Sequence, residues 1–131
     1  LISYFDLIFT NPPFFFENNV IKSKNKSIND SKYISKEKAK IWILKMIKYL
    51  KPEGKAYIIN RYENLNFMLD LLKKNKCRVS ITPLLSFKGS IPKNVLLCVN
   101  KNKNYVEKKE NEIIIHRNPY EYSKNIANWF K

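Results

Sequence analysis

The stretch Tyr4-Phe5-Asp6-Leu7-Ile8-Phe9-Thr10-Asn11-Pro12-Pro13-Phe14 decides how the rest of this chain can fold. Its first half is apolar and rich in β-favouring residues, so it predicts a short buried strand. The strand must end at Asn11-Pro12-Pro13, because proline has no backbone N–H for a sheet and keeps the preceding residue extended. Asn11 is therefore expected at the carboxyl end of a strand, which is the edge at which open α/β sheets bind ligands.

Residues Ile8 to Phe14 resemble the Asn/Asp-Pro-Pro-aromatic signature of S-adenosylmethionine-dependent methyltransferases that modify amino nitrogens. The signature is shared by enzymes that act on adenine N6, guanine N2 and glutamine N5. The resemblance implies S-adenosylmethionine as cofactor, catalytic roles for Asn11 and Pro12, a cofactor contact for Asn11, and substrate contacts for Pro13 and Phe14. The alternative interpretation of the same residues is a strand that ends in an ordinary Asn-Pro turn.

The chemistry of such a motif follows from its residue types. An amino group conjugated to a ring is a poor nucleophile, because its lone pair is delocalised. The side-chain carbonyl of Asn11 and the backbone carbonyl of Pro12 can each accept one N–H bond and so aim that lone pair at the sulfonium methyl. The gain would be positioning and stabilisation of the developing positive charge. Phe14 would offer a flat face for the base, and such stacking is worth about 1–3 kcal/mol.

Composition and charge limit the remaining possibilities. The chain has 131 residues, 44% of them hydrophobic, and a formal net charge of +14 from 25 Lys and Arg against 11 Asp and Glu. This charge favours a polyanionic partner such as RNA or DNA, although the lysine bias of an AT-rich genome is an alternative cause. Neither a signal peptide nor an apolar run of the roughly 18 residues that a membrane span needs is expected. Cys77, Cys98 and His116 lack metal-ligand spacing, so we expect no metal site, two reduced thiols and a cytoplasmic protein.

Residues 15–34 follow the motif directly and show neither helical nor strand periodicity. Lys22 and Lys24 lie among polar residues in this stretch. One interpretation is a flexible, solvated loop. The other is a basic flap over the substrate site, in which Lys22 and Lys24 bind the substrate, since loops beside a rigid scaffold often carry recognition.

The downstream pattern alternates strands and helices. A helix is expected from Ser35, its N-cap, to a stop at residues 50–54, with Trp42 in its buried face. The other expected elements are a buried strand over 55–61, a helix over 63–75, and strands over 78–87 and 94–100 that form an antiparallel hairpin. Residues 101–131 form a Lys-rich C-terminal extension.

This order resembles the second half of the Rossmann-like methyltransferase sheet. Phe87 to Leu96 is similar to the Gly-x-x-(Pro/Ala)-x-Arg-hydrophobic-Leu pattern of the tRNA1(Val) adenine-37 N6-methyltransferase group, with Lys93-Asn94 where arginine is common. The resemblance implies an α/β fold and methylation of adenine N6 in tRNA. Guanine N2 in rRNA, glutamine N5 in protein, and an inactive RNA-binding remnant are the alternatives.

The cofactor half of such a domain has no counterpart in the sequence. Gly54 and Gly89 are the only glycines, so a Gly-rich cofactor loop is missing. We therefore expect residues 1–131 to form a partial methyltransferase domain whose partner is the absent N-terminal half. By itself, this partial domain is expected to bind S-adenosylmethionine poorly. The open edge of the first strand would favour association, and the oligomeric state is left open.

Overall fold

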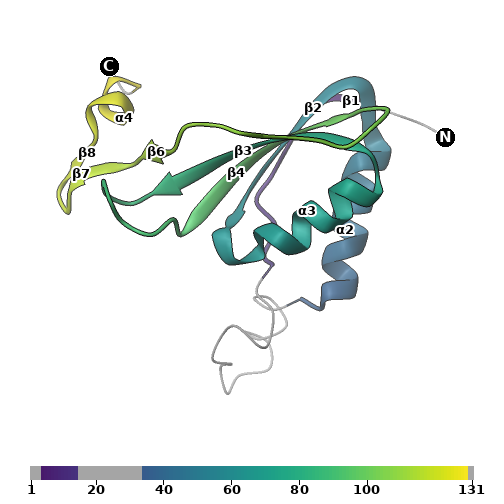
Figure 1. The fold of residues 1–131 in the computed structure, drawn as a ribbon, viewed down its shortest axis with the longest axis horizontal. Coiled ribbons are helices and arrows are strands. Elements are labelled where there is room, and N and C mark those ends of the chain that lie inside the picture. The colour runs from purple at the N-terminus through teal and green to yellow at the C-terminus, as the bar shows by residue number, and fades with distance from the viewer. Residues whose placement is uncertain (1–3, 15–33, 130–131) are drawn as a thin grey trace.

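The computed structural model describes residues 4–14 and 34–129, and its centre is a mixed β-sheet (Figure 1). The strands of this sheet are β1 (Phe5–Thr10), β2 (Leu50–Arg61), β3 (Cys77–Leu85), β4 (Asn94–Lys101), β5 (Val106–Lys109) and β6 (Ile113–Ile114). The strand order is β1-β2-β4-β3-β5, and β6 also pairs with β3. β1 and β2 are parallel, whereas β4 is antiparallel to both of its neighbours. The predicted α/β fold and its antiparallel hairpin are confirmed.

Two helices lie along one face of the sheet (Figure 1). α2 (Lys36–Tyr49) connects β1 to β2, and α3 (Leu65–Lys74) follows the short 3-10 helix η2 (Tyr62–Asn64). The predicted N-cap of α2 is confirmed, since the Ser35 side chain accepts a hydrogen bond from the backbone N–H of Lys38. Because α2 crosses from β1 to a parallel β2, the carboxyl ends of both strands meet at the same edge of the sheet.

The core lies between this helical layer and the sheet. β2 and β4 contribute Ala56, Ile58, Val95 and Leu97, and α3 contributes Leu72; all five are fully buried. Their alternation with exposed residues along the strands is the period of two that a half-covered sheet produces. The helical layer therefore covers one sheet face and fixes the position of the strand ends.

The first strand is less buried than its sequence predicts. Phe5, Leu7 and Phe9 are half-exposed or more, and Phe9 is 72% exposed, while Ile8 packs against the core. The reason is topological: β1 is the edge strand and pairs only with β2 in the described part of the chain. Its apolar run was correctly identified as a strand, but the expectation of burial was wrong.

The predicted helix stop at residues 50–54 is confirmed, but the second strand begins at Leu50 and not at Lys55 as expected. α2 ends at Tyr49 and β2 begins at Leu50, so these residues belong to the strand. The register jumps from Phe5 paired with Leu50 to Leu7 paired with Lys55, and the extra residues bulge outward. A Cβ on Gly54 would lie 2.9 Å from the Phe5 carbonyl oxygen, so glycine allows the two backbones to approach here.

The chain beyond β4 first adds two strands to the sheet and then leaves the sheet. β5 and β6 pair in parallel with β3 at the edge opposite β1, so part of the Lys-rich extension is a sheet edge. The last elements are β7 (His116–Asn118), β8 (Glu121–Tyr122) and α4 (Lys124–Asn128), at the end of the molecule far from the N-terminus (Figure 1). Among the described helices, none has the length and apolarity required to cross a membrane.

Candidate functional site at the carboxyl end of β1

The Asn-Pro-Pro-Phe turn lies where the sequence predicts it, directly after the end of β1. Thr10 pairs with Ile58, so Asn60 and Arg61 at the end of β2 extend beside the turn. Arg61 pairs in turn with Asn94 at the start of the antiparallel β4. Three neighbouring strand ends therefore bring polar side chains to one edge of the sheet.

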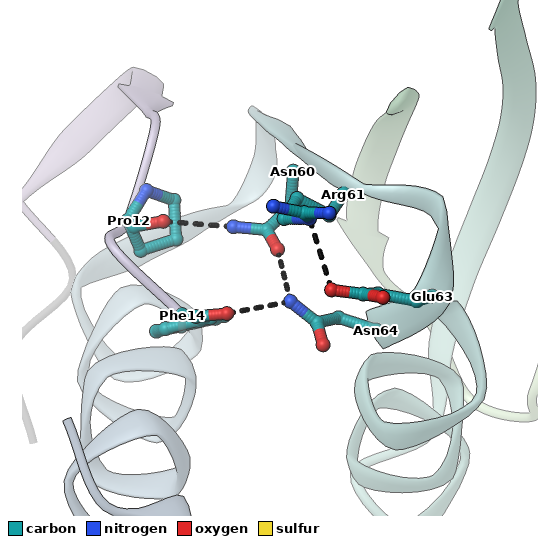
Figure 2. Close-up of polar contacts among 6 residues, drawn as sticks. All are labelled: Pro12, Phe14, Asn60, Arg61, Glu63 and Asn64. Atoms are coloured by element: carbon teal, nitrogen blue, oxygen red, sulfur yellow. Dashed lines mark hydrogen bonds and ion pairs between the residues drawn. The ribbon is translucent and has the colours of Figure 1, made fainter. Parts of the chain in front are cut away.

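Two buried asparagines from the β2–α3 corner hold the turn (Figure 2). The Asn60 side-chain amide donates to the Pro12 carbonyl oxygen at 2.8 Å. The Asn64 amide donates to the Phe14 carbonyl at 2.7 Å and to the Asn60 side-chain oxygen at 2.7 Å. Asn60 is 5% exposed and Asn64 is 2% exposed, so these bonds are shielded from water.

The Pro12 carbonyl is already occupied in this arrangement. Besides the Asn60 amide, it accepts the backbone N–H of Phe14 at 2.9 Å. A carbonyl oxygen has two lone pairs, so both acceptor positions are used within the chain. The predicted hydrogen bond from a substrate amine to the Pro12 carbonyl oxygen therefore requires that this oxygen be shared or that the Asn60 amide move away.

Asn11 is the acceptor that is open. It is exposed, and none of the hydrogen bonds recorded among the described residues involves its side chain. It borders a pocket of about 310 Å³ lined by Asn11, Pro12, Pro13, Phe14, Asn60, Arg61 and Asn94. The structure thus brings the predicted residues Asn11, Pro12 and Pro13 together at one pocket, with Pro13 partly exposed.

Phe14 does not occupy the position of a stacking surface. Its side chain is 2% exposed and belongs to the hydrophobic core. Its ring meets the Trp42 ring edge-on, with centroids 6.1 Å apart and planes at 86°. The prediction that a base stacks on Phe14 disagrees with this burial, because the ring packs in the core beside Trp42 of α2. Phe14 lines the pocket as its anchored floor.

Basic and acidic side chains lie next to the pocket. Arg61 forms an ion pair with Glu63, with 2.9 Å between Nε and Oε1 (Figure 2). A second hollow of about 520 Å³ continues from Arg61 along Pro92, Lys93 and Asn94. The predicted substrate residues Lys22 and Lys24, with the rest of the basic loop, lie outside the described residues.

An apolar groove of about 610 Å³ lies between β1 and α2. Phe5, Leu7 and Phe9 line one side and Ile41 and Trp42 the other. Trp42 is 41% exposed and its indole N–H donates to the Thr10 hydroxyl at 3.0 Å, so the expectation that it is a core residue was wrong. The helical period correctly makes the α2 face apolar, but nothing in the described chain covers this part of it.

The two cysteines lie away from the site. Cys77 is fully buried at the start of β3, and burial raises the pKa of its thiol to about 11. Cys98 on β4 is partly exposed, and its interaction with Tyr57 raises the pKa of that phenol. Within residues 4–14 and 34–129, no cluster of three or more His, Cys, Asp or Glu side chains could hold a metal ion.

Sequence reasoning missed Asn60 and Asn64. The available signal was the parallel pairing of two strands, because a polar residue that ends the second strand must lie beside a motif that ends the first. Asn64, four residues after Asn60, carried no separate signal. Its role depends on the tight η2 turn that returns the chain toward Phe14.

Several solved structures resemble this chain at low sequence identity. A predicted O-methyltransferase from Agrobacterium tumefaciens superposes with a TM-score of 0.61 at 13% identity over 68% of this chain and 43% of its own. M1.HpyAVI gives a TM-score of 0.42 at 16% identity, covering 85% of this chain and 56% of its own. The M1.HpyAVI-SAM complex gives 0.41 at 15% identity, covering 98% and 64%. The first of these structures shares its fold with this chain, and the chain spans between 43% and 64% of the length of the three.

The family follows from the sequence as a whole. A model of the N-6 DNA Methylase family matches residues 2–130, and the chain belongs to this family. Among curated proteins there is no significant sequence match. The membership confirms the predicted methyltransferase class and its S-adenosylmethionine cofactor. It does not support the narrower assignment to the tRNA1(Val) group, because the family description names DNA.

Proposed function

We propose that this chain supplies the amine-holding part of an S-adenosylmethionine-dependent methyltransferase that acts on adenine N6 in nucleic acid. The observation that carries the proposal is the exposed Asn11 side chain, which stands at a pocket on the carboxyl edge of the sheet beside a proline-stiffened turn. Family membership supports the same reaction.

The reaction assigns each group a simple task. S-adenosylmethionine, when bound, supplies a sulfonium methyl group. The Asn11 carbonyl accepts one N–H of the target amine and holds the nitrogen lone pair toward that methyl. As the new N–C bond forms and the S–C bond breaks, the nitrogen becomes positive and then releases one proton to water. Asn11 stabilises the charge while the proton is still present.

The more specific part of the proposal is the identity of the nucleic acid substrate, DNA or RNA. The family description favours DNA, whereas the sequence pattern alone favoured tRNA, and a net charge of +14 suits either. The target base must leave its stack to reach the pocket in both cases. A panel of duplex DNA, tRNA, rRNA fragments and a glutamine-containing protein substrate separates adenine N6 from guanine N2 and glutamine N5.

Asn11→Ala tests the role of the amine acceptor. We expect it to reduce methyl transfer below detection while the circular dichroism spectrum and nucleic-acid affinity stay unchanged, because Asn11 is exposed and holds no structural bond among the described residues. Asn104→Ala, a change at another exposed asparagine in the turn between β4 and β5, is the matched control. Full transfer by Asn11→Ala would exclude the proposed mechanism.

We further propose that the groove between β1 and α2 receives the cofactor-binding half of the domain. Support comes from the unpaired outer edge of β1 in the described residues and from the apolar groove beside it. Calorimetric titration of S-adenosylhomocysteine into the 131-residue chain tests whether the chain binds the cofactor product without that half. Absence of binding is expected, and saturable binding would show that the chain completes a cofactor site by itself or as a dimer.

A further inference from the structure

The Asn60–Asn64 pair has a fixed orientation that follows from its partners. The carbonyls of Pro12 and Phe14 can only accept hydrogen bonds, so the NH₂ group of each asparagine must face them. Asn64 uses both of its amide hydrogens, one on Phe14 and one on the Asn60 side-chain oxygen. Neither amide can flip without the loss of these bonds.

The Asn60–Asn64 pair also supplies hydrogen-bond donors that the Asn-Pro-Pro-Phe turn lacks. Pro12 and Pro13 have no backbone N–H, so the turn offers few donors for its own carbonyls. Phe14 provides one bond to the Pro12 carbonyl, at 2.9 Å, and Asn60 and Asn64 each donate one further bond across the fold, to the carbonyls of Pro12 and Phe14. These asparagines stand at the end of β2 and just before α3, so they tie the turn to a different part of the core.

We propose that Asn60 and Asn64 are positioning residues for amino-methyl transfer, which set the place of Asn11 by fixing the carbonyls of Pro12 and Phe14. The inference rests on the function proposed above. In this structure the Asn60 amide and the Phe14 N–H both bond the Pro12 carbonyl, and they fix the turn next to the exposed side-chain acceptor of Asn11. A shift of about 1 Å in that acceptor is enough to lower a rate by about 100-fold.

The test separates kcat from KM in this chain joined to the cofactor-binding half of the domain, because the chain by itself is not expected to bind S-adenosylmethionine. The methyl donor is labelled S-adenosylmethionine, and the acceptor is whichever polymer of the panel the wild-type protein methylates. Asn60→Ala and Asn64→Ala are each expected to lower kcat by about 10- to 100-fold, with KM for the polymer within about threefold of wild type. Asn100→Ala is the matched control, because its amide also donates from the sheet to a backbone carbonyl, that of Gly54, at 2.8 Å.

The outcomes are distinct. Absence of transfer by the wild-type protein would contradict the proposed function itself. Active wild type with unchanged kcat in both variants, or an equal fall of kcat in Asn100→Ala, would overturn only the positioning role. A lower KM with preserved kcat in Asn60→Ala would also overturn it, since the amide would then compete with the substrate for Pro12. If one variant does not fold, the other alone decides.

Discussion

Removal of the Asn64 side chain should weaken the fold far more than removal of an ordinary surface asparagine. In Asn64→Ala, the Phe14 carbonyl and the Asn60 side-chain oxygen each lose a donor at 2.7 Å. The residue is 2% exposed, so water does not readily replace the amide. The perturbation therefore removes the hydrogen bonds that these two acceptors receive from Asn64 inside the protein.

The expected cost follows from these two bonds. A typical net contribution is about 1 kcal/mol per hydrogen bond, and a buried group left unsatisfied costs about 1–3 kcal/mol. The sum predicts a loss of about 2–4 kcal/mol in the free energy of unfolding, from a total that is typically about 5–15 kcal/mol. Asn100→Ala removes one partly buried bond and should cost about 1 kcal/mol.

Urea denaturation monitored by circular dichroism measures both variants. With a slope of about 1–3 kcal/mol per M, Asn64→Ala should lower the midpoint by roughly 1–2 M at an unchanged slope. The double variant with Asn60→Ala should lose less than the sum of the single losses, because the two amides share a bond. If Asn64→Ala costs no more than Asn100→Ala, or if the losses add, the description of the pair as one network is refuted.

Further predictions concern the bulge, the buried thiol and the basic hollow. Gly54→Ala should cost about 1–3 kcal/mol in the same urea assay, because its Cβ would press on the Phe5 carbonyl, and an unchanged midpoint would contradict this. Iodoacetamide should label Cys98 well before Cys77, as read by peptide mass spectrometry, since the folded Cys77 thiol keeps its proton to about pH 11. Equal labelling rates would contradict the burial of Cys77. Because the unfolded thiol has a pKa near 9.0, the free energy of unfolding should fall as the pH rises from 9.0 toward 11. Lys93→Ala should reduce the salt dependence of nucleic-acid binding by about one unit of slope, and an unchanged slope would remove it from the interface.

The parts of the fold that local patterns determine were predictable from sequence. The Ser35 cap, the α2 and α3 periodicities and the hairpin of β3 and β4 each depend on residues close in sequence. Burial of β1 was not predictable, because the same apolar run fits a central strand and an edge strand equally well. The start of β2 at Leu50 was missed for a related reason: a proline and a glycine, which indicate the end of a helix, also occur together at a bulge of a strand.

The candidate site was predictable only in part. Asn11, Pro12 and Pro13 could be found because their spacing is a motif within one turn. The burial of Phe14 depends on Trp42, which lies on a helix 28 residues later, and no local pattern reports that contact. Asn60 and Asn64 depend on strand pairing across the chain, so a residue-type search near the motif could not identify them.

The same pairing explains why the site and the open groove lie on one strand. β1 gives its carboxyl end to the Asn-Pro-Pro-Phe turn and one edge to β2, which brings Asn60 to that turn. Its other edge borders the groove beside α2, which Phe5 and Phe9 also line. An element docked there would contact β1 along its length and act on Asn11 through the strand itself. We therefore expect occupation of the groove to affect the alignment of the proposed amine acceptor, Asn11, through β1, whereas the Asn60–Asn64 pair holds the turn from β2 and η2.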